Sequence, residues 1–113
     1  MNKDGAQGEL DKAKEKNIQE LQMLEQNLQN TLLQKQAFQI ELRETQAALK
    51  ELEKSGDEVF KIIGQLLIKT DKKSVVSELI SKEKMMDLRI KGFERQEHAL
   101  SEKFEELQRE FAK

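Results

Sequence analysis

The side chains that could carry out chemistry are few and poorly grouped in this chain of 113 residues. The one histidine, His98, cannot build a histidine-rich metal site, and the lack of cysteine removes thiol chemistry and cysteine-based zinc sites. Adjacent acids such as Glu105 and Glu106 would suit acid–base catalysis only inside a pocket that desolvates one of them. We find no nucleotide-binding loop, catalytic triad or metal-ligand spacing. The sequence therefore predicts no catalytic residues, no metal site, no cofactor and no enzymatic activity.

The composition instead favours an elongated structure with a narrow core. Charged residues make up 37% of the chain and hydrophobic residues 36%, with five Phe as the only aromatics. So little apolar surface cannot offset the entropy of ordering a round domain, which leaves disorder or a thin apolar seam. The 20 basic and 22 acidic residues are mixed along the chain, which argues against a nucleic-acid partner. Without an apolar run of membrane or signal-peptide type, we expect a soluble, cytoplasmic protein with no membrane partner.

A seven-residue apolar pattern from Leu10 to Glu53 predicts a helix over about residues 10–54. The chain has no proline to interrupt it. Steps of three and four place two rows on one helix face, which is typical of a coiled-coil seam. These rows are Lys14, Leu21, Leu28, Lys35, Leu42, Leu49 and Leu10, Asn17, Leu24, Thr31, Phe38, Thr45, Leu52. Residues 1–9, with two glycines and no apolar period, are predicted to form a flexible lead-in.

A second seam predicts a second helix over about residues 74–112. Its rows are Val76, Glu83, Ile90, Glu97, Phe104, Phe111 and Leu79, Met86, Phe93, Leu100, Leu107. Folding the chain back about Gly64 sets Leu42 opposite Met86 and Thr31 opposite Glu97. In this register Lys35 either pairs with Glu97 along the seam or extends to solvent. The predicted fold class is mainly α: a long antiparallel two-helix coiled coil joined by one β-hairpin.

The segment between the two seams predicts a β-hairpin over about residues 58–70. Gly56 stands where a helix C-terminus favours glycine, and Ser74 is a candidate N-cap for the second helix. Gly64 followed by Gln65 suits a two-residue type II′ turn. Both faces of the hairpin are apolar, so it requires more burial than one chain provides. We therefore predict assembly through residues 59–69, the alternative being a local cap on the coiled coil.

The hairpin motif between two long helices resembles the β-class subunits of archaeal prefoldins. It reads Val59-Phe60-Lys61-Ile62-Ile63-Gly64-Gln65-Leu66-Leu67-Ile68-Lys69. The resemblance extends from Asn17 to Phe111 and defines a prefoldin-like domain over residues 10–113. Subunits of the α class carry two hairpins, whereas the ~20 residues between the seams leave room for one. Residues 1–16 depart from the family because they are longer and more charged.

The resemblance implies a chaperone that holds unfolded proteins without ATP. Family members assemble as hexamers of two α-class and four β-class subunits, whose hairpins form a β-barrel body. The tips of their coiled coils grip non-native client proteins and deliver them to a group II chaperonin. The implied assembly residues are Val59, Phe60, Ile62, Ile63, Gly64, Leu66, Leu67 and Ile68.

The candidate client-binding residues lie at the open end of the coiled coil, away from the hairpin. Terminal helical turns fray and expose their apolar side chains, which suits binding of many unfolded chains. The candidates are Leu10, Ile18, Leu21, Leu107 and Phe111. For Leu21 and Leu107 an ordinary place in the seam is the competing interpretation.

Two other function classes are alternatives to a chaperone. A structural coiled-coil adaptor would hold two partners at a set distance, but it has no need of a hairpin that is apolar on both faces. An RNA-binding arm would need a basic outer face, and the charges are too evenly balanced for that.

Overall fold

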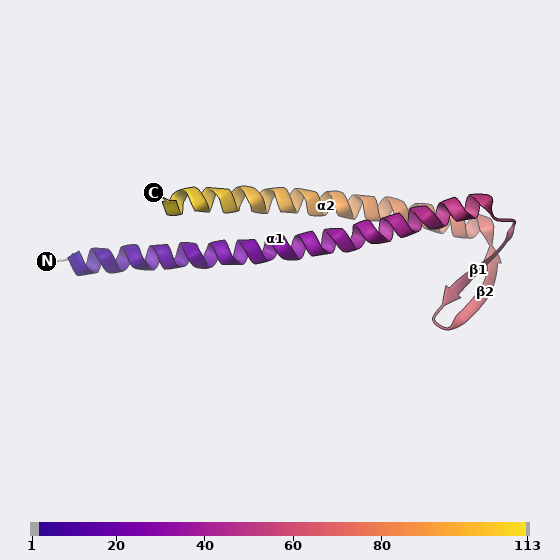
Figure 1. Ribbon diagram of the computed structural model, residues 1–113, viewed down its shortest axis with the longest axis horizontal. Helices are drawn as coiled ribbons and strands as arrows, with labels where there is room; N and C mark the ends of the chain where they lie inside the picture. Colours follow the sequence, from indigo (N-terminus) through magenta and orange to yellow (C-terminus); the bar gives the residue numbers. More distant parts are fainter. Residues whose placement is uncertain (1–2, 113) are drawn as a thin grey trace. The chain divides into compact units, whose positions relative to one another are not determined.

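The computed structural model describes residues 3–112 and contains two helices and two strands. Helix α1 (Lys3–Lys54) is followed by strands β1 (Glu58–Ile63) and β2 (Leu66–Asp71) and by helix α2 (Lys72–Ala112) (Figure 1). The two strands pair antiparallel and form a two-stranded sheet. The predicted fold class, two long helices with one β-hairpin between them, is therefore confirmed.

Helix α1 begins earlier than the sequence predicted. Residues 3–9 are helical, whereas we expected a flexible lead-in; residues 1–2 lie outside the described part of the chain. Gly5 and Gly8 each disfavour a helix by about 1 kcal/mol relative to Ala. No proline blocks the extension, however, and adding a residue to an existing helix needs no new nucleus. The Nε2 of Gln7 also donates a hydrogen bond of 3.2 Å to Oδ1 of Asp11, one turn further on.

The chain forms two compact units. The terminal unit contains α1 up to Gln34 and α2 from Phe93 onward, and the hairpin unit contains residues 35–92. In the terminal unit the two helix segments run antiparallel, side by side (Figure 1). The hairpin unit contains the rest of α1, both strands and the first half of α2.

The core of the terminal unit follows the predicted heptad rows. Leu24 and Thr31 are buried. Most other apolar members of the rows in this unit are partly buried, namely Leu21, Leu28, Phe93, Leu100, Phe104 and Leu107. The exceptions are Leu10 and Phe111 at the open end, which are exposed. Met23 and Leu33, which lie off the rows on the same helix, are exposed. The three-and-four spacing therefore selects the buried face of α1, as expected for a coiled-coil seam.

The hairpin unit has the most completely buried side chain of the described residues, Met86, at 0% exposure. Ile90 is also buried, and Leu42, predicted to face Met86, is partly buried. The guanidinium carbon of Arg89 lies 5.6 Å from the ring centroid of Phe38, a distance that allows a cation–π contact. These positions support the predicted seam in this unit.

A polar residue in this seam is satisfied within its own helix. Thr45 is buried, and its Oγ1 donates a hydrogen bond of 2.9 Å to the carbonyl oxygen of Glu41. A threonine can therefore occupy a core position without leaving a buried hydroxyl unpaired. The two alternatives for Lys35, an ion pair with Glu97 along the seam or extension to solvent, both stay predictions.

The hairpin has the predicted two-residue loop and type II′ turn. Ile63 pairs with Leu66, so Gly64 and Gln65 are the loop residues. Among residues 3–112, a positive φ occurs at Gly64 alone, with a value of 60°. A positive φ at the first loop residue only is the type II′ pattern, and glycine adopts it without strain.

The ends of the helices differ from the sequence-based expectation. Gly56 does not adopt a left-handed conformation, so it is not the C-terminal cap of α1. Instead, the backbone N–H and the hydroxyl of Ser55 both donate to the carbonyl oxygen of Leu52, at 3.3 Å and 3.0 Å. At the start of α2, Oδ2 of Asp71 accepts from the backbone N–H and the hydroxyl of Ser74, at 3.3 Å and 3.2 Å. Asp71 is therefore the N-cap, and the expectation for Ser74 was wrong because a carboxylate stands three residues before it.

Candidate functional site

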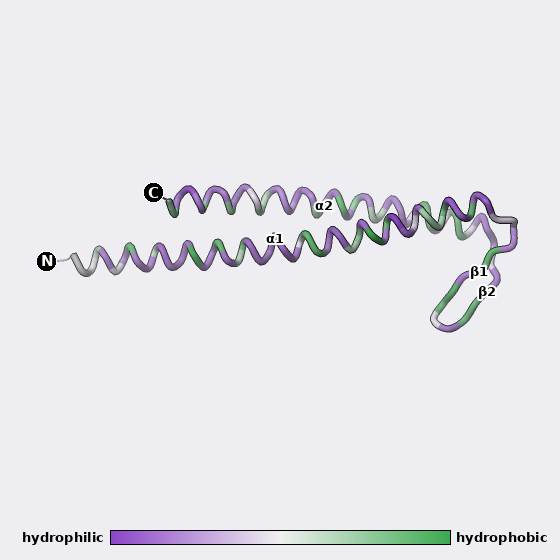
Figure 2. The backbone as a smooth tube through the Cα atoms, in the orientation of Figure 1, coloured by the Kyte–Doolittle hydropathy of each residue, from purple (hydrophilic) through white to green (hydrophobic). Residues whose placement is uncertain are grey.

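The hairpin exposes an unusual amount of apolar surface for so short an element. Its large hydrophobic side chains are between 41% and 74% exposed, and Figure 2 shows hydrophobic residues along both strands. Because side chains alternate across a strand, the exposed groups stand on both faces of the sheet. The exposed set is Phe60, Ile62, Ile63, Leu66, Leu67 and Ile68. Contiguous exposed apolar patches of this kind mark interaction surfaces of proteins.

One end of the hairpin is attached to α2. The Nζ of Lys61 donates to Oε1 and Oε2 of Glu78 at 2.8 Å and 2.9 Å. Val59, two residues before Lys61 and on the same face of β1, is buried. The ion pair therefore joins the hairpin to α2, and Val59 is the one buried residue of the two strands, whereas the large apolar side chains of the hairpin stay exposed.

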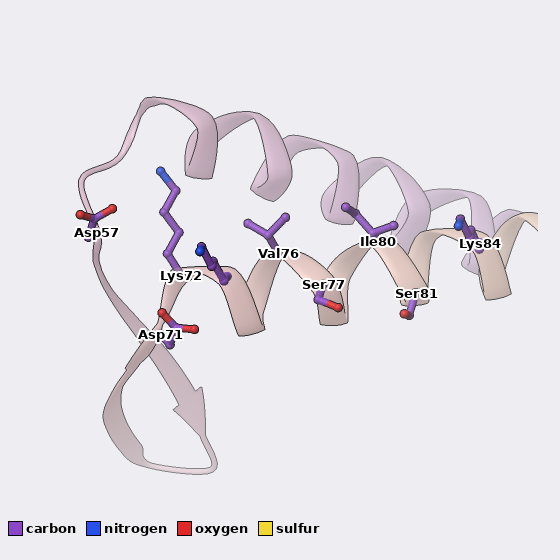
Figure 3. A pocket seen from close by; sticks show the side chains of 9 residues that line it. Asp57, Asp71, Lys72, Val76, Ser77, Ile80, Ser81 and Lys84 are labelled. Carbon is purple, nitrogen blue, oxygen red and sulfur yellow. The ribbon is translucent and has the colours of Figure 1, made fainter.

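A further hydrogen bond joins the start of α2 to the residue that follows α1. The Nζ of Lys72, the first residue of α2, donates a hydrogen bond of 2.9 Å to the carbonyl oxygen of Ser55. Figure 3 shows the Lys72 side chain extended towards the end of α1, with Asp57 on the adjoining loop. The bond satisfies a carbonyl group just beyond the helix C-terminus with a cation, an arrangement that helix ends favour.

An open cleft of about 910 Å³ lies at this junction. Its lining includes Asp57, Asp71, Lys72, Lys73, Val76, Ser77, Ile80, Ser81 and Lys84 (Figure 3). Two of its charged groups have structural partners, because Asp71 caps α2 and Lys72 binds Ser55. We see no nucleophile paired with a base in this lining.

No helix within residues 3–112 is both long enough and apolar enough to cross a membrane.

At the open end of the terminal unit, α1 continues past the end of α2 (Figure 1). Leu10, Ile18 and Phe111 are exposed there, at 57%, 40% and 42%. Leu21 and Leu107 are partly buried, in line with seam positions. The structure therefore separates the five predicted client-binding residues into three exposed side chains and two partly buried ones.

Sequence reasoning did not single out several exposed apolar residues away from both ends. On α1 these include Met23, Leu33 and Ile40, and on α2 Met85 and Leu88. Leu33 and Ile40 are seven residues apart, so a search for a second heptad row would have found that pair. The partnership of Lys61 with Glu78 was also missed, because the two residues lie in different elements and no local pattern links them.

Comparison with known proteins decides the family. The model of a family described as "Prefoldin subunit" matches residues 5–113, nearly the whole chain. The chain belongs to the prefoldin family. Membership makes it a chaperone subunit of prefoldin type, because prefoldins are chaperones. The family is not known for enzymes. This confirms the predicted resemblance and favours a chaperone over an adaptor.

Individual prefoldins are similar over most of their length. Prefoldin subunit beta of Archaeoglobus fulgidus is 40% identical over 103 residues, covering 89% of each chain. Prefoldin subunit beta of Thermococcus onnurineus is 41% identical over 90 residues, 78% of each chain. The crystal structure of the prefoldin beta subunit from Thermococcus strain KS-1 superposes with a TM-score of 0.80 at 37% identity. The matched region makes up 88% of this chain and 89% of the Thermococcus chain. The likeness therefore includes the hairpin as well as the helices.

Proposed function

We propose that this chain is the β-class subunit of a prefoldin that holds unfolded proteins without using ATP. The observation that carries the proposal is the similarity to prefoldin beta subunits along almost the full chain. The proposed particle contains two α-class and four β-class subunits and acts in the cytoplasm. It needs no cofactor and catalyses no reaction, because its work is reversible binding.

Assembly would occur through the hairpin. Burying an exposed Ile or Leu side chain contributes roughly 1.5–3 kcal/mol, and the hairpin presents six large apolar side chains. An isolated two-stranded hairpin is at best marginally stable in water, and its open strand edges can pair with strands of other subunits. Both the apolar faces and the unpaired edges therefore support burial against further β copies and an α-class subunit.

Client capture would occur at the open end of the terminal unit. Leu10, Ile18 and Phe111 offer apolar surface there without a pocket, which suits unfolded chains of varied sequence. Leu21 and Leu107 would join them only when the terminal turns fray. The captured client would then pass to a group II chaperonin, which completes its folding.

The test uses the particle assembled from this chain and an α-class subunit. Removing residues 1–18 and 105–113 deletes Leu10, Ile18, Leu107 and Phe111 but keeps the hairpin and most of the seam. We expect the truncated particle to assemble, and its helical signal to fall only in proportion to length. Its ability to keep a denatured test protein from aggregating should fall steeply, with no nucleotide needed before or after truncation.

Two sets of point variants test whether client binding depends on the position of an apolar side chain or only on its exposure. The first set changes Leu10, Ile18 and Phe111 to Ser at the open end, and the second changes Ile40, Met85 and Leu88 to Ser. All six side chains are exposed. We expect aggregation of the test protein to increase with the first set and not with the second. Light scattering of each particle controls for assembly.

Two outcomes would contradict the proposal in different ways. Equal protection by the full and truncated particles would place client binding elsewhere than Leu10, Ile18 and Phe111. A full-length, correctly assembled particle that protects no test protein at all would remove the holdase function. In that case the structural adaptor would become the better hypothesis.

A further inference from the structure

A segment of α1 in the terminal unit carries no charge. Residues 26–34 read Gln-Asn-Leu-Gln-Asn-Thr-Leu-Leu-Gln, in a chain whose residues are 37% charged. Coiled-coil surfaces normally carry charges that keep them soluble and select their partners. Here side-chain amides replace those charges, which suggests a different role for this surface.

These amides meet α2 at a small groove of about 250 Å³. Its lining is Asn27, Asn30, Thr31 and Gln34 from α1, and Gln96 and Leu100 from α2. Thr31 is buried and Leu100 partly buried, so they form the floor, whereas the four amides are exposed and form the walls. All six residues belong to the terminal unit.

The amides of the walls are available for binding. Within residues 3–112, no hydrogen bond engages the side chains of Asn27, Asn30, Gln34 or Gln96. Met23, 64% exposed, precedes Asn27 by one turn and extends the same strip of α1 with an apolar group. The strip therefore combines unused hydrogen-bonding groups with a flexible, polarisable side chain that adapts to different neighbours.

We propose that this groove binds the backbone of an extended segment of a non-native polypeptide, as a second client contact apart from the open end. A side-chain amide both donates and accepts, so it can bond the N–H and C=O groups that an unfolded chain leaves unpaired. The lack of charge means that clients of either sign are accepted alike. The inference rests on the proposed holdase function and adds a site to it.

The size of the groove favours this occupant over a small molecule. Sites for drug-sized ligands typically enclose ~300–1,000 Å³, and this groove is smaller and lined mainly by polar groups. A helix of a second copy would need a longer apolar contact than Thr31 and Leu100 provide, because coiled coils associate through continuous apolar rows. A stretch of peptide backbone requires only closely spaced donors and acceptors.

The absence of cysteine allows a direct test by site-specific cross-linking. Asn30→Cys places a benzophenone label in the groove, Gln29→Cys places it on the neighbouring exposed residue outside the lining, and Phe111→Cys places it at the open end. Each labelled chain is assembled with an α-class subunit. The probe is reduced, carboxymethylated α-lactalbumin, which stays unfolded and has no free thiol. We expect strong cross-linking from Asn30 and Phe111 and weak cross-linking from Gln29.

A second measurement replaces amides by carboxylates without truncating them. Asn30→Glu with Gln34→Glu alters the walls, whereas Gln26→Glu with Gln29→Glu adds the same charge outside the groove. The first pair should weaken binding of the same probe by roughly two- to tenfold for each hydrogen bond lost, as measured by fluorescence anisotropy. The second pair should leave the affinity unchanged.

The outcomes distinguish a failure of the groove proposal from a failure of the proposed holdase function. Cross-linking from Phe111 with equal, weak signals from Asn30 and Gln29 would overturn the groove and leave the holdase intact. No cross-linking from any position would overturn both. If the carboxylate pair in the groove changes the mass of the particle instead of its affinity for the probe, the groove is an interface between subunits and the inference is wrong.

Discussion

Lys61 and Glu78 form the closest ion pair between the hairpin and α2 among the described residues. The Nζ of Lys61 lies 2.8 Å and 2.9 Å from the two carboxylate oxygens of Glu78. Because Lys61 is in β1 and Glu78 in the second turn of α2, the pair links the direction of the strands to that of the helix. The orientation in which the hairpin presents its apolar residues is thus partly set within a single chain.

The first prediction concerns the strength of this pair. Both side chains are about half exposed, so a double-mutant cycle with Lys61→Met and Glu78→Gln should give a coupling of about 0.2–1 kcal/mol. Salt should reduce the coupling, because exposed charges are screened. Urea unfolding at fixed protein concentration measures it. A coupling that is zero at low salt would mean that the pair does not orient the hairpin.

The second prediction concerns the assembly surface. Ile62 and Leu67 pair directly across the two strands and are among the most exposed residues of the hairpin. Changing both to Lys should abolish the oligomer while leaving the helical circular dichroism intact, because two charges would have to be buried at the interface. Gln22→Lys with Gln46→Lys, both exposed positions of α1, controls for added charge. An unchanged particle mass of the hairpin variant in light scattering would contradict assembly through these strands.

The third prediction compares two apolar residues of α2 that are two positions apart. Met86 is fully buried and Leu88 is exposed. Met86→Ala should lower the free energy of unfolding by about 2–5 kcal/mol, because it leaves a cavity in the seam. Leu88→Ala should stay within about 0.5 kcal/mol of the original chain. Similar losses from both substitutions in thermal or urea unfolding would show that the heptad rows are misassigned.

The fourth prediction concerns the start of α2. Asp71→Ala should destabilise the protein by about 0.5–2 kcal/mol, because the N–H of Ser74 loses its acceptor. Asp71→Asn should retain most of the stability, since an asparagine oxygen also caps helices well. Ser74→Ala should have the smaller effect of the two alanine substitutions. The reverse order of the two losses would restore Ser74 as the cap.

The seam and the hairpin were predictable because both depend on local spacing. Heptad rows place Leu24, Met86 and Ile90 on the inner faces of their helices, and these are buried residues of the structure. Gly64 followed by Gln65 specified the type II′ turn, since the first loop residue of that turn needs a positive φ. The sequence by itself therefore determined the helices, the turn and which side chains face inward.

Contacts between elements were decided only by the tertiary structure. Lys61 meets Glu78, and Lys72 meets the carbonyl of Ser55, across 17 residues of chain that periodicity does not describe. The amide groove likewise exists only where Gln96 of α2 lies beside the uncharged strip of α1. Burial patterns report which face of an element turns inward, but not which polar groups come within hydrogen-bonding distance. That depends on how the chain brings separate elements together in space, which the spacing within each element does not encode.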